Sequence, residues 1–549
     1  MTGKRISAYF MTRRCRCSAL LCAVLCPFPC WAQSKAAPAS TSSAAGLKQT
    51  AYIKASNPHA NDHFGNGGTL EGHGLALSGD GMTMAVGAPY ESSAAKGING
   101  DQNNTSLYAS GAVYVFTQKN GAWTQQAYIK GSNPGQSYRF GHHISLSQDG
   151  NTMAVSSHFE ASDAKGVFNG DGGNQNDKSI PQAGAVYVFT RTGTAWTQQA
   201  YIKASNTGEK GTLDKPDEGD QFGFSIALSA DGNTLVAGAI SEDSKATGIN
   251  GDETDNSQQS SGAAYVFVRN GTAWTQQAYV KPSNTFAAML FGYSLGLSAD
   301  GNTMAVAAYD ERGSAREING VQDRNRPGAG AIYVFARTGT IWVQTDYLKA
   351  HNAENGDSLG YDMAISQDGN TIAGGAGDED CFAAGVNPKE PCDNDYKTDT
   401  STGAAYIFVR RNGKWSEQAF IKASHPGKED WFASRLNLSG DGNTLAVGAQ
   451  LENGNSKGIN GNELDVSAED SGALYLFTRT GDTWVQKAYM KGTNTEAYDE
   501  FGSSMALSKD GKILAVGARG ESSGAKGVNG NQNDNSAQGA GAVYVFSNQ

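Results

Sequence analysis

Acidic and amide side chains recur at matching places along the chain, and their oxygen atoms are the ligands that a calcium ion prefers. One repeated residue is a glutamate, found seven times, at Glu91, Glu160, Glu242, Glu311, Glu379, Glu452 and Glu521. The other is an asparagine, which follows each glutamate by eight or nine residues, at Asn99, Asn169, Asn250, Asn319, Asn387, Asn460 and Asn529. Together these residues could bind a cation in every repeat.

Aspartates close to some of these asparagines are the best additional ligands. They are Asp101, Asp171, Asp177, Asp252 and Asp255, and four of them lie in the oxygen-rich stretches 169–177 and 250–256. Calcium is the one cofactor that this composition indicates, although the spacing differs from that of an EF-hand loop. A further acidic stretch holds Asp393, Asp395 and Asp399, with Lys397 in its middle.

A structural role for the same residues is the alternative, and the repetition favours it. The glutamate could accept backbone N–H bonds, or pair with the cation that follows it in five repeats, while the asparagine could shape a tight turn. Those five cations are Lys96, Lys165, Arg316, Lys457 and Lys526. A binding site seldom needs every repeat alike, so we expect loop architecture first and cation binding second.

Motifs for catalysis are weak, and no catalytic residue is predicted. Gly292-Tyr293-Ser294-Leu295-Gly296 has the spacing of a nucleophile elbow, but it coincides with a predicted strand instead of a strand-to-helix turn. No His-Glu-x-x-His motif or phosphate-binding loop is present. We expect His142, His143 and His158 to be polar surface or packing residues, and His59, Asp62 and His63 to lie in a solvated loop.

The elements that position these residues repeat seven times. The pattern Gly-Ala-x-Tyr-x-Phe begins at Gly111, Gly184, Gly262, Gly330, Gly403, Gly472 and Gly541. Each unit also has two short apolar runs joined by Asp-Gly, which predicts a type I′ hairpin, and a run that begins with Trp in six units. Four antiparallel strands per unit predict an all-β, seven-bladed β-propeller over residues 48–549.

The chain ends predict how the ring closes. The last unit stops after its third strand, at Phe546, and a fourth-strand pattern occurs once too early, at residues 50–54. An N-terminal strand that completes the last blade would remove an open edge. The six tryptophans are expected to pack between blades, and the lysines that end these strands are expected to protect outer edges. Those lysines are Lys54, Lys130, Lys203, Lys281, Lys349, Lys422 and Lys491.

The first 32 residues differ from the rest and predict export. Five basic residues precede a short apolar run that ends in a small-x-small cleavage site, as in a secretory signal peptide. Residues 33–47, which are rich in alanine and serine, are predicted to form a flexible linker. Removing the five basic residues from the 43, while all 54 acidic ones remain, gives a net charge of −16. This charge disfavours nucleic acid. No membrane span is predicted, and a disulfide is expected between Cys381 and Cys392.

The Phe64-Gly65 pair, followed by Gly87-Ala88-Pro89 and the Gly-Ala-Val-Tyr-Val-Phe strand, resembles the FG-GAP repeat. That repeat builds the seven-bladed propeller of integrin α subunits and of many exported bacterial proteins. In this chain Phe64-Gly65 lies earlier in its repeat than the Phe-Gly pairs of the other repeats, and Glu71-Gly72 occupies the position that aligns with those pairs. Many FG-GAP repeats carry an acidic calcium loop between the first two strands. Here that connection is a Ser-x-Asp-Gly turn, too short to supply six to eight oxygens, so the inherited sites are expected to be absent.

The resemblance implies adhesion or ligand binding without catalysis. We therefore expect an exported, monomeric, non-enzymatic propeller that presents its long connections to a protein or glycan partner, because function usually lies on loops held by a rigid frame. The alternative is a lyase or hydrolase that acts on polysaccharide with acidic residues around the central channel. That alternative predicts one or two blades with unique polar residues near the axis, and the near-uniform blades argue against it.

Overall fold

The structure is a computed structural model, and it describes residues 46–66, 72–208, 219–389, 392 and 400–548. The predicted signal peptide, most of the predicted linker and the stretch with Asp393, Asp395 and Asp399 lie outside these ranges. The described residues form 29 strands in seven antiparallel sheets. They contain no helix long and apolar enough to cross a membrane.

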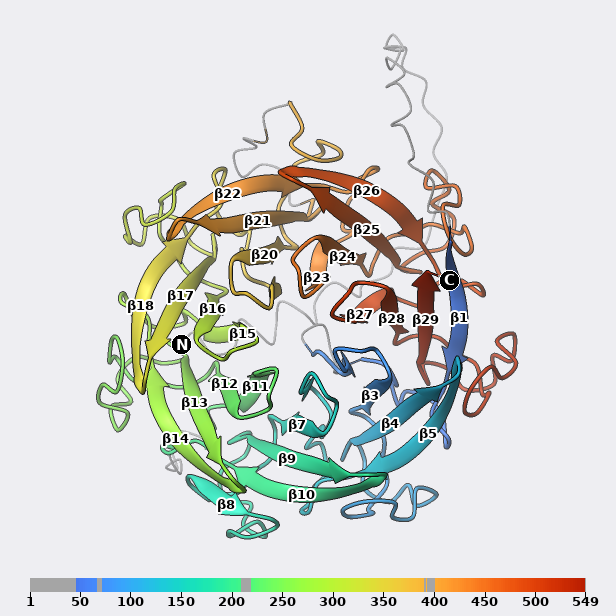
Figure 1. Cartoon of the computed structure of the whole chain (residues 1–549), viewed down its shortest axis with the longest axis horizontal. Helices are drawn as coiled ribbons and strands as arrows, with labels where there is room; N and C mark the ends of the chain where they lie inside the picture. The colour runs from blue at the N-terminus through green and yellow to red at the C-terminus, as the bar shows by residue number, and fades with distance from the viewer. Residues whose placement is uncertain (1–45, 67–71, 209–218, 390–391, 393–399, 549) are drawn as a thin grey trace, which may run out of the picture. The chain divides into compact units, whose positions relative to one another are not determined.

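Each sheet is one blade, and its strands follow one another from the axis outward (Figure 1). Blade 1 consists of β2 (Leu75–Leu77), β3 (Thr83–Ala88), β4 (Ala112–Lys119) and β5 (Ala122–Ile129). Blade 2 consists of β6 (Ile144–Leu146), β7 (Thr152–Ser157), β8 (Val167–Asn169), β9 (Ala185–Thr192) and β10 (Ala195–Ile202). Blade 3 consists of β11 (Phe222–Leu228), β12 (Thr234–Ala239), β13 (Ala263–Asn270) and β14 (Ala273–Val280). Blade 4 consists of β15 (Phe291–Leu297), β16 (Thr303–Ala308), β17 (Ala331–Thr338) and β18 (Ile341–Leu348). Blade 5 consists of β19 (Met363–Ile365), β20 (Thr371–Ala376), β21 (Ala404–Arg411) and β22 (Lys414–Ile421). Blade 6 consists of β23 (Phe432–Leu438), β24 (Thr444–Ala449), β25 (Ala473–Thr480) and β26 (Thr483–Met490). Blade 7 consists of β27 (Phe501–Leu507), β28 (Ile513–Ala518), β29 (Ala542–Asn548) and β1 (Leu47–Ile53).

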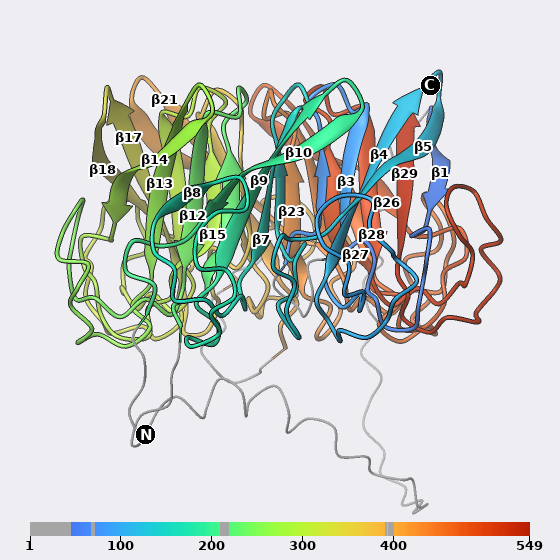
Figure 2. The ribbon, with the colours of Figure 1, turned by 90° about the horizontal axis from the view of Figure 1, so that it is seen from below.

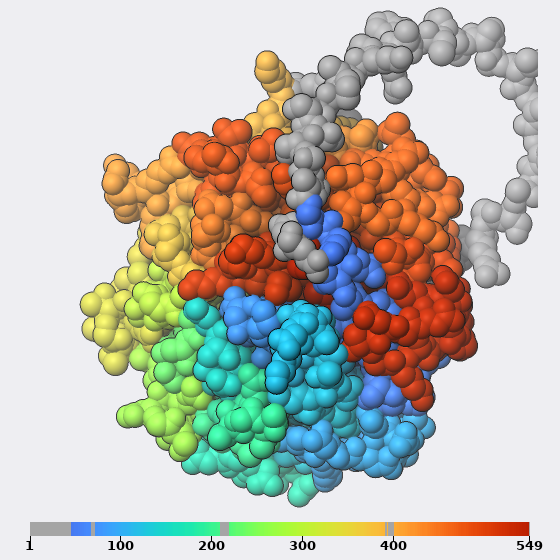
Figure 3. Space-filling model, turned by 45° about the vertical axis from the view of Figure 1, so that its right-hand side comes forward, coloured from blue at the N-terminus to red at the C-terminus, as the bar shows by residue number. Residues whose placement is uncertain are grey.

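The ring closes as predicted. Strand β1 pairs antiparallel with β29, with Tyr52 opposite Tyr544, so the two ends of the described chain complete one blade. Figure 3 shows this seam, where residues from the beginning and the end of the chain lie against each other. The closing strand begins at Leu47, three residues earlier than the sequence pattern indicates.

The connections divide between two faces of the ring. Short hairpins join the first strand to the second and the third to the fourth, and they lie on one face (Figure 2). The longer connections lie on the other, which we call the long-loop face. The hairpins between first and second strands are not type I′, because only the glycine of each Asp-Gly pair has a positive φ. In blade 1, for example, Gly81 donates its N–H to the carbonyl of Ser78 (2.8 Å), and Asp80 accepts the N–H of Met82 (2.9 Å).

The hydrophobic core lies between blades, and the Phe-Gly pair organises it. In blade 3, Phe222 packs edge-on against Tyr265 and Phe267 of the third strand, with ring centroids 5.4 and 5.9 Å apart. Phe64 makes the matching contacts with its own blade, so Phe64-Gly65 holds the same place as the other Phe-Gly pairs. The prediction that Glu71-Gly72 occupies it was wrong, because the extra residues follow the pair instead of preceding it.

The tryptophans join neighbouring blades, as predicted. In four blades the indole N–H donates to a glutamine of the preceding blade at 2.9–3.0 Å, and an arginine from the adjacent third strand stacks on the indole ring. These four residues are Trp196, Trp274, Trp342 and Trp484.

A closed circle of backbone hydrogen bonds surrounds the axis at the hairpin face. One residue of each blade donates its N–H to the carbonyl of the next blade at 2.8–3.0 Å, and the seventh bonds back to the first. The circle runs through Gly79, Gln148, Ala230, Ala299, Gln367, Gly440 and Lys509. The same residues and a ring of six leucines and Ile365 line a cavity of about 170 Å³ on the axis. The turns that follow the first strands therefore bond to one another around the axis.

Candidate functional site

The seven repeated glutamates are buried, and each forms an ion pair with the lysine that ends a fourth strand. Six of the pairs have Nζ–O distances of 2.6–3.0 Å. The pairs are Lys54–Glu521, Lys130–Glu91, Lys203–Glu160, Lys281–Glu242, Lys349–Glu311, Lys422–Glu379 and Lys491–Glu452. Burial lowers the pKa of every one of these lysines, and the nearby glutamate opposes that effect.

Two predictions about these charges were therefore wrong. The lysines do not protect an exposed edge, because all seven are buried. The glutamates do form ion pairs, but with the strand lysine and not with the loop cation such as Lys96 or Lys526. The other role expected for them is present in three blades, where Glu160, Glu311 and Glu379 each accept a backbone N–H. In several blades a tyrosine hydroxyl also donates a hydrogen bond to the same carboxylate, as Tyr279 does to Glu242 (2.7 Å). Each pair fastens the start of the long connection after a second strand to the end of a fourth strand.

The repeated asparagines fasten the middle of the same connections. In six blades the side-chain oxygen accepts the backbone N–H of an aromatic residue in the fourth strand, and the asparagine N–H donates back to that residue's carbonyl. For Asn250 and Tyr279 these distances are 2.9 and 2.7 Å. The six asparagines have φ of 47–58°, a conformation that asparagine tolerates well. In blade 2 the connection instead forms β8, which ends at Asn169 and pairs with β10.

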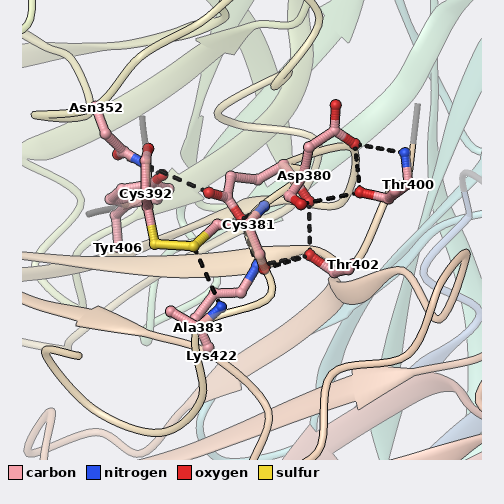
Figure 4. Close-up of a disulfide and its surroundings, with 10 residues drawn as sticks. Asn352, Asp380, Cys381, Ala383, Cys392, Thr400, Thr402, Tyr406 and Lys422 are labelled. Atoms are coloured by element: carbon pink, nitrogen blue, oxygen red, sulfur yellow. Dashed lines mark hydrogen bonds and ion pairs between the residues drawn. A yellow bond between two sulfur atoms is a disulfide. The ribbon is translucent and has the colours of Figure 1, made fainter. Parts of the chain in front are cut away.

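The predicted disulfide between Cys381 and Cys392 is present (Figure 4). In three other blades a serine hydroxyl makes the corresponding closure by donating to a backbone carbonyl eight residues later, as Ser93 does to Asp101 (2.7 Å). Blade 5 keeps its ion pair, Lys422–Glu379. The disulfide thus replaces a hydrogen bond at the neck of the connection, and the buried ion pair of the blade is kept.

The five aspartates proposed as calcium ligands lie on exposed or half-exposed parts of these connections. Asp101, Asp177, Asp252 and Asp255 each accept hydrogen bonds from the backbone or hydroxyl of their own loop, and Asp255 also pairs with Lys245 (2.8 Å). No three of the five carboxylates meet. Within the described ranges, the one close group of three metal-binding side chains is Glu379, Cys381 and Cys392, and its sulfurs form the disulfide. Calcium binding stays a prediction.

Five blades carry a buried aspartate two residues before the first-strand Phe or Leu. Each accepts a backbone N–H from the preceding connection at 2.7–2.9 Å. Burial raises the pKa of all five: to about 6 for Asp62 and about 7 for Asp357, Asp430 and Asp499, with Asp220 also raised. Asp62 thus lies in the interior and not in a solvated loop.

Replacing Asp430 with asparagine should stabilise the protein at pH 8 and have little effect at pH 4. Burial, and then Glu452, raise the folded-state pKa to about 7, above the ordinary 3.8, so the stability linked to this group is present below pH 3.8 and is lost as the pH rises through 7. Asparagine keeps the acceptor without the charge, and the expected gain at pH 8 is roughly 1–4 kcal/mol. Melting temperatures measured from pH 4 to pH 8 check this.

Asp252→Asn is the matched control. Hydrogen bonds from the hydroxyl and N–H of Thr254 lower the pKa of Asp252, so its removal should give no gain at pH 8. Equal pH profiles for the two variants would contradict the role assigned to Asp430.

A cavity of about 230 Å³ lies on the axis, between the first strands and toward the long-loop face. Asp362 is the one carboxylate among its described lining residues, and its Oδ1 is 2.8 Å from Nε2 of His73. Asp362 also accepts the N–H groups of Met363 and Leu436 (both 2.8 Å). His73 belongs to blade 1 and Asp362 to blade 5, so the pair crosses the axis. Glycosidases mostly use two carboxylates, and the described lining of this cavity offers one that is already paired.

The residue before the first-strand Phe or Leu lies in the left-handed region in all seven blades, with φ of 53–61°. Its identity differs in every blade: His63, Arg139, Gln221, Leu290, Ser358, Trp431 and Glu500. Because the conformation recurs in every blade it belongs to the fold, whereas the side chain at this position differs from blade to blade. Exposed apolar side chains gather in the long connections as well, at Tyr108, Val321, Phe382, Leu464, Val466 and Tyr498, with exposed fractions of 52–72%. The non-repeating residues and the exposed apolar residues thus share the long-loop face.

Sequence reasoning missed the polar residues near the axis. His142 and His158 are buried, with ring centroids 3.8 Å apart, so they are packing residues, which is one of the two roles expected for them. The signal that could have found this region is the position before each Phe, because it varies completely within an otherwise repetitive unit. Ser294, by contrast, lies in strand β15 as expected, and the elbow-like motif has no turn.

Comparisons with known proteins find one family match and a distant structural similarity. Residues 484–546 match the FG-GAP repeat family, a segment that contains the fourth strand of blade 6 and most of the first three strands of blade 7. No curated protein matches the chain. Among solved structures, a candidate 6-phosphogluconolactonase from Bacteroides uniformis is similar at 10% identity and a TM-score of 0.41, over 76% of this chain and 85% of that chain. The chain is thus a seven-bladed β-propeller in which residues 484–546 match the FG-GAP repeat, and the strands of that segment recur in the other blades.

Proposed function

We propose that the protein is exported and non-enzymatic, and that it binds a protein or glycan ligand on its long-loop face, as an adhesion protein does. The observation that carries the proposal is the contrast between a repeated frame and a varied face. Lysine–glutamate pairs, asparagine bonds and buried aspartates hold the long connections in the same way in most blades. The residues that differ between blades, and most of the exposed apolar ones, lie on those connections.

Export rests on the N-terminal sequence, and two features are consistent with it. The Cys381–Cys392 disulfide is stable in an oxidising compartment. The family also includes many exported proteins. The absence of catalysis remains part of the proposal, supported by the single, paired carboxylate among the described residues of the axial cavity.

Tethering the protein through opposite faces tests the proposal. Thr272→Cys places a thiol in an exposed hairpin of blade 3, and Gln259→Cys places one in an exposed long connection of the same blade. Each variant is coupled densely to a surface by its thiol and probed with glycan and extracellular-protein libraries. We expect ligands to bind the Thr272→Cys surface and to bind the Gln259→Cys surface much less. No ligand at all, or equal binding in both orientations, would overturn the proposal.

A further inference from the structure

Arg139 is held between two aromatic rings where blades 1 and 2 meet on the long-loop face. It is the varied residue that precedes Phe140. Its guanidinium carbon lies 4.8 Å from the ring centroid of Tyr90 and 4.7 Å from that of Phe159. These two residues follow the second strands of blades 1 and 2, so each blade supplies one ring. Two rings from neighbouring blades thus contact the guanidinium of one half-buried arginine, an arrangement that orients its N–H donors.

No carboxylate within the described ranges pairs with this arginine. Its Nε is buried and has no hydrogen-bond partner there. The arginines of the third strands differ in this respect, because each donates to side chains around it, as Arg269 does to Asn233 (2.9 Å). Buried donors in native proteins are nearly always satisfied, so an unsatisfied one in a charged side chain points to a missing acceptor.

Three histidines around Arg139 share this lack of partners. His142 and His158 are 1% and 2% exposed, and Nδ1 of each, like Nδ1 of His63, is buried without a hydrogen bond to the described residues. Burial lowers the pKa of all three, and Arg139 adds to that effect in each case; for His63 the value is about 4. The group thus combines one cation with neutral imidazoles, and an anion is the ligand that would satisfy it.

The arrangement occurs once in the ring. The residues that match Arg139 in the other blades include no second arginine, and those that match Tyr90 and Phe159 are Ser241, Asp310, Asp378, Leu451 and Gly520. A structural device would be expected in most blades, like the lysine–glutamate pairs. Its restriction to one junction indicates a single binding site.

We propose that this junction binds the carboxylate of an acidic sugar, a uronic acid in a glycan; this rests on the proposed function and names its ligand class. The planar guanidinium edge matches a planar carboxylate in a bidentate pair. Tyr108, 61% exposed, provides a nearby ring for the sugar face, since its carbonyl accepts the N–H of Ser137, two residues before Arg139 (2.9 Å). The net charge of the chain, −11, disfavours a long polyanion and favours isolated uronic acids.

The test compares methyl glucuronide with its uncharged counterpart, methyl glucoside, by titration calorimetry on the full chain. We expect the glucuronide to bind at least about 10-fold more tightly, because one charged, bidentate pair is lost in the glucoside. Arg139→Gln should lower glucuronide affinity by about 10- to 100-fold, and Arg139→Lys should also lower it, because lysine cannot make the bidentate pair. Arg324→Gln, which removes an exposed arginine stacked on a different ring (Phe286, 4.9 Å), should leave it unchanged.

The outcomes separate this inference from the proposed function. Equal binding of both sugars, or glucuronide binding that Arg139→Gln leaves intact in a folded variant, would overturn the acidic-sugar site. Neither result would affect the orientation experiment, which tests the proposed function independently. A peptide with one glutamate serves as a further probe. If it binds in an Arg139-dependent way and the glucuronide does not, the site recognises acidic peptide and the sugar assignment is wrong.

Discussion

Gly262→Ala is expected to destabilise the protein by roughly 3–5 kcal/mol, among the largest effects of any single substitution. Gly262 begins the repeated Gly-Ala-x-Tyr-x-Phe strand of blade 3 with φ of 79°, which costs an alanine about 1–2 kcal/mol. An added Cβ would also overlap the backbone of Phe291 in blade 4, with which Gly262 forms a parallel bridge. The two blades would have to separate, at the expense of the core between them. Thermal and urea unfolding of purified protein measure the loss.

Gly271→Ala separates the two causes. This hairpin glycine has φ of 62°, but an added Cβ would have no neighbour within 4 Å. Only the backbone cost of about 1–2 kcal/mol should appear. Equal losses for the two variants would show that the close approach of neighbouring blades contributes nothing.

Lys281→Met is expected to cost about 3–5 kcal/mol, because it leaves Glu242 charged and buried without its partner. The Lys281 ammonium contacts the Glu242 carboxylate, the Ser261 hydroxyl and the Gly262 carbonyl, all at 2.7 Å. Adding Glu242→Gln should recover much of the loss, since the second change removes the uncompensated charge. A thermodynamic cycle over the two single variants and the double variant measures this coupling.

Lys245→Met is the control, because Lys245 forms its ion pair with Asp255 at the surface, where it is 64% exposed. Such exposed pairs are screened by solvent, so this substitution should have a much smaller effect than Lys281→Met. Comparable effects at Lys281 and Lys245 would mean that the buried pairs do not fasten the long connections.

The repetition of short, fully apolar strands determined most of the fold. Seven copies of one unit, with neither face of the third strand polar, fit sheets that pack on both sides, and the misplaced fourth strand at residues 50–54 fixed how the ring closes. These features are local or periodic, so a single chain displays them. Cys381 and Cys392 were likewise close enough in the chain for their disulfide to be predicted.

The sequence alone could not reveal contacts between residues that lie far apart in the chain and belong to no common motif. Glu242 has Lys245 nearby in the sequence, yet it pairs with Lys281. Lys281 is buried at the end of the fourth strand, away from water, and the Glu242 carboxylate is the acidic group that contacts it there. His73 and Asp362 meet only because the ring brings blades 1 and 5 across a common axis. The junction around Arg139 was hidden for a related reason: its residues do not repeat, and only packing of two neighbouring blades brings Tyr90 and Phe159 to one guanidinium.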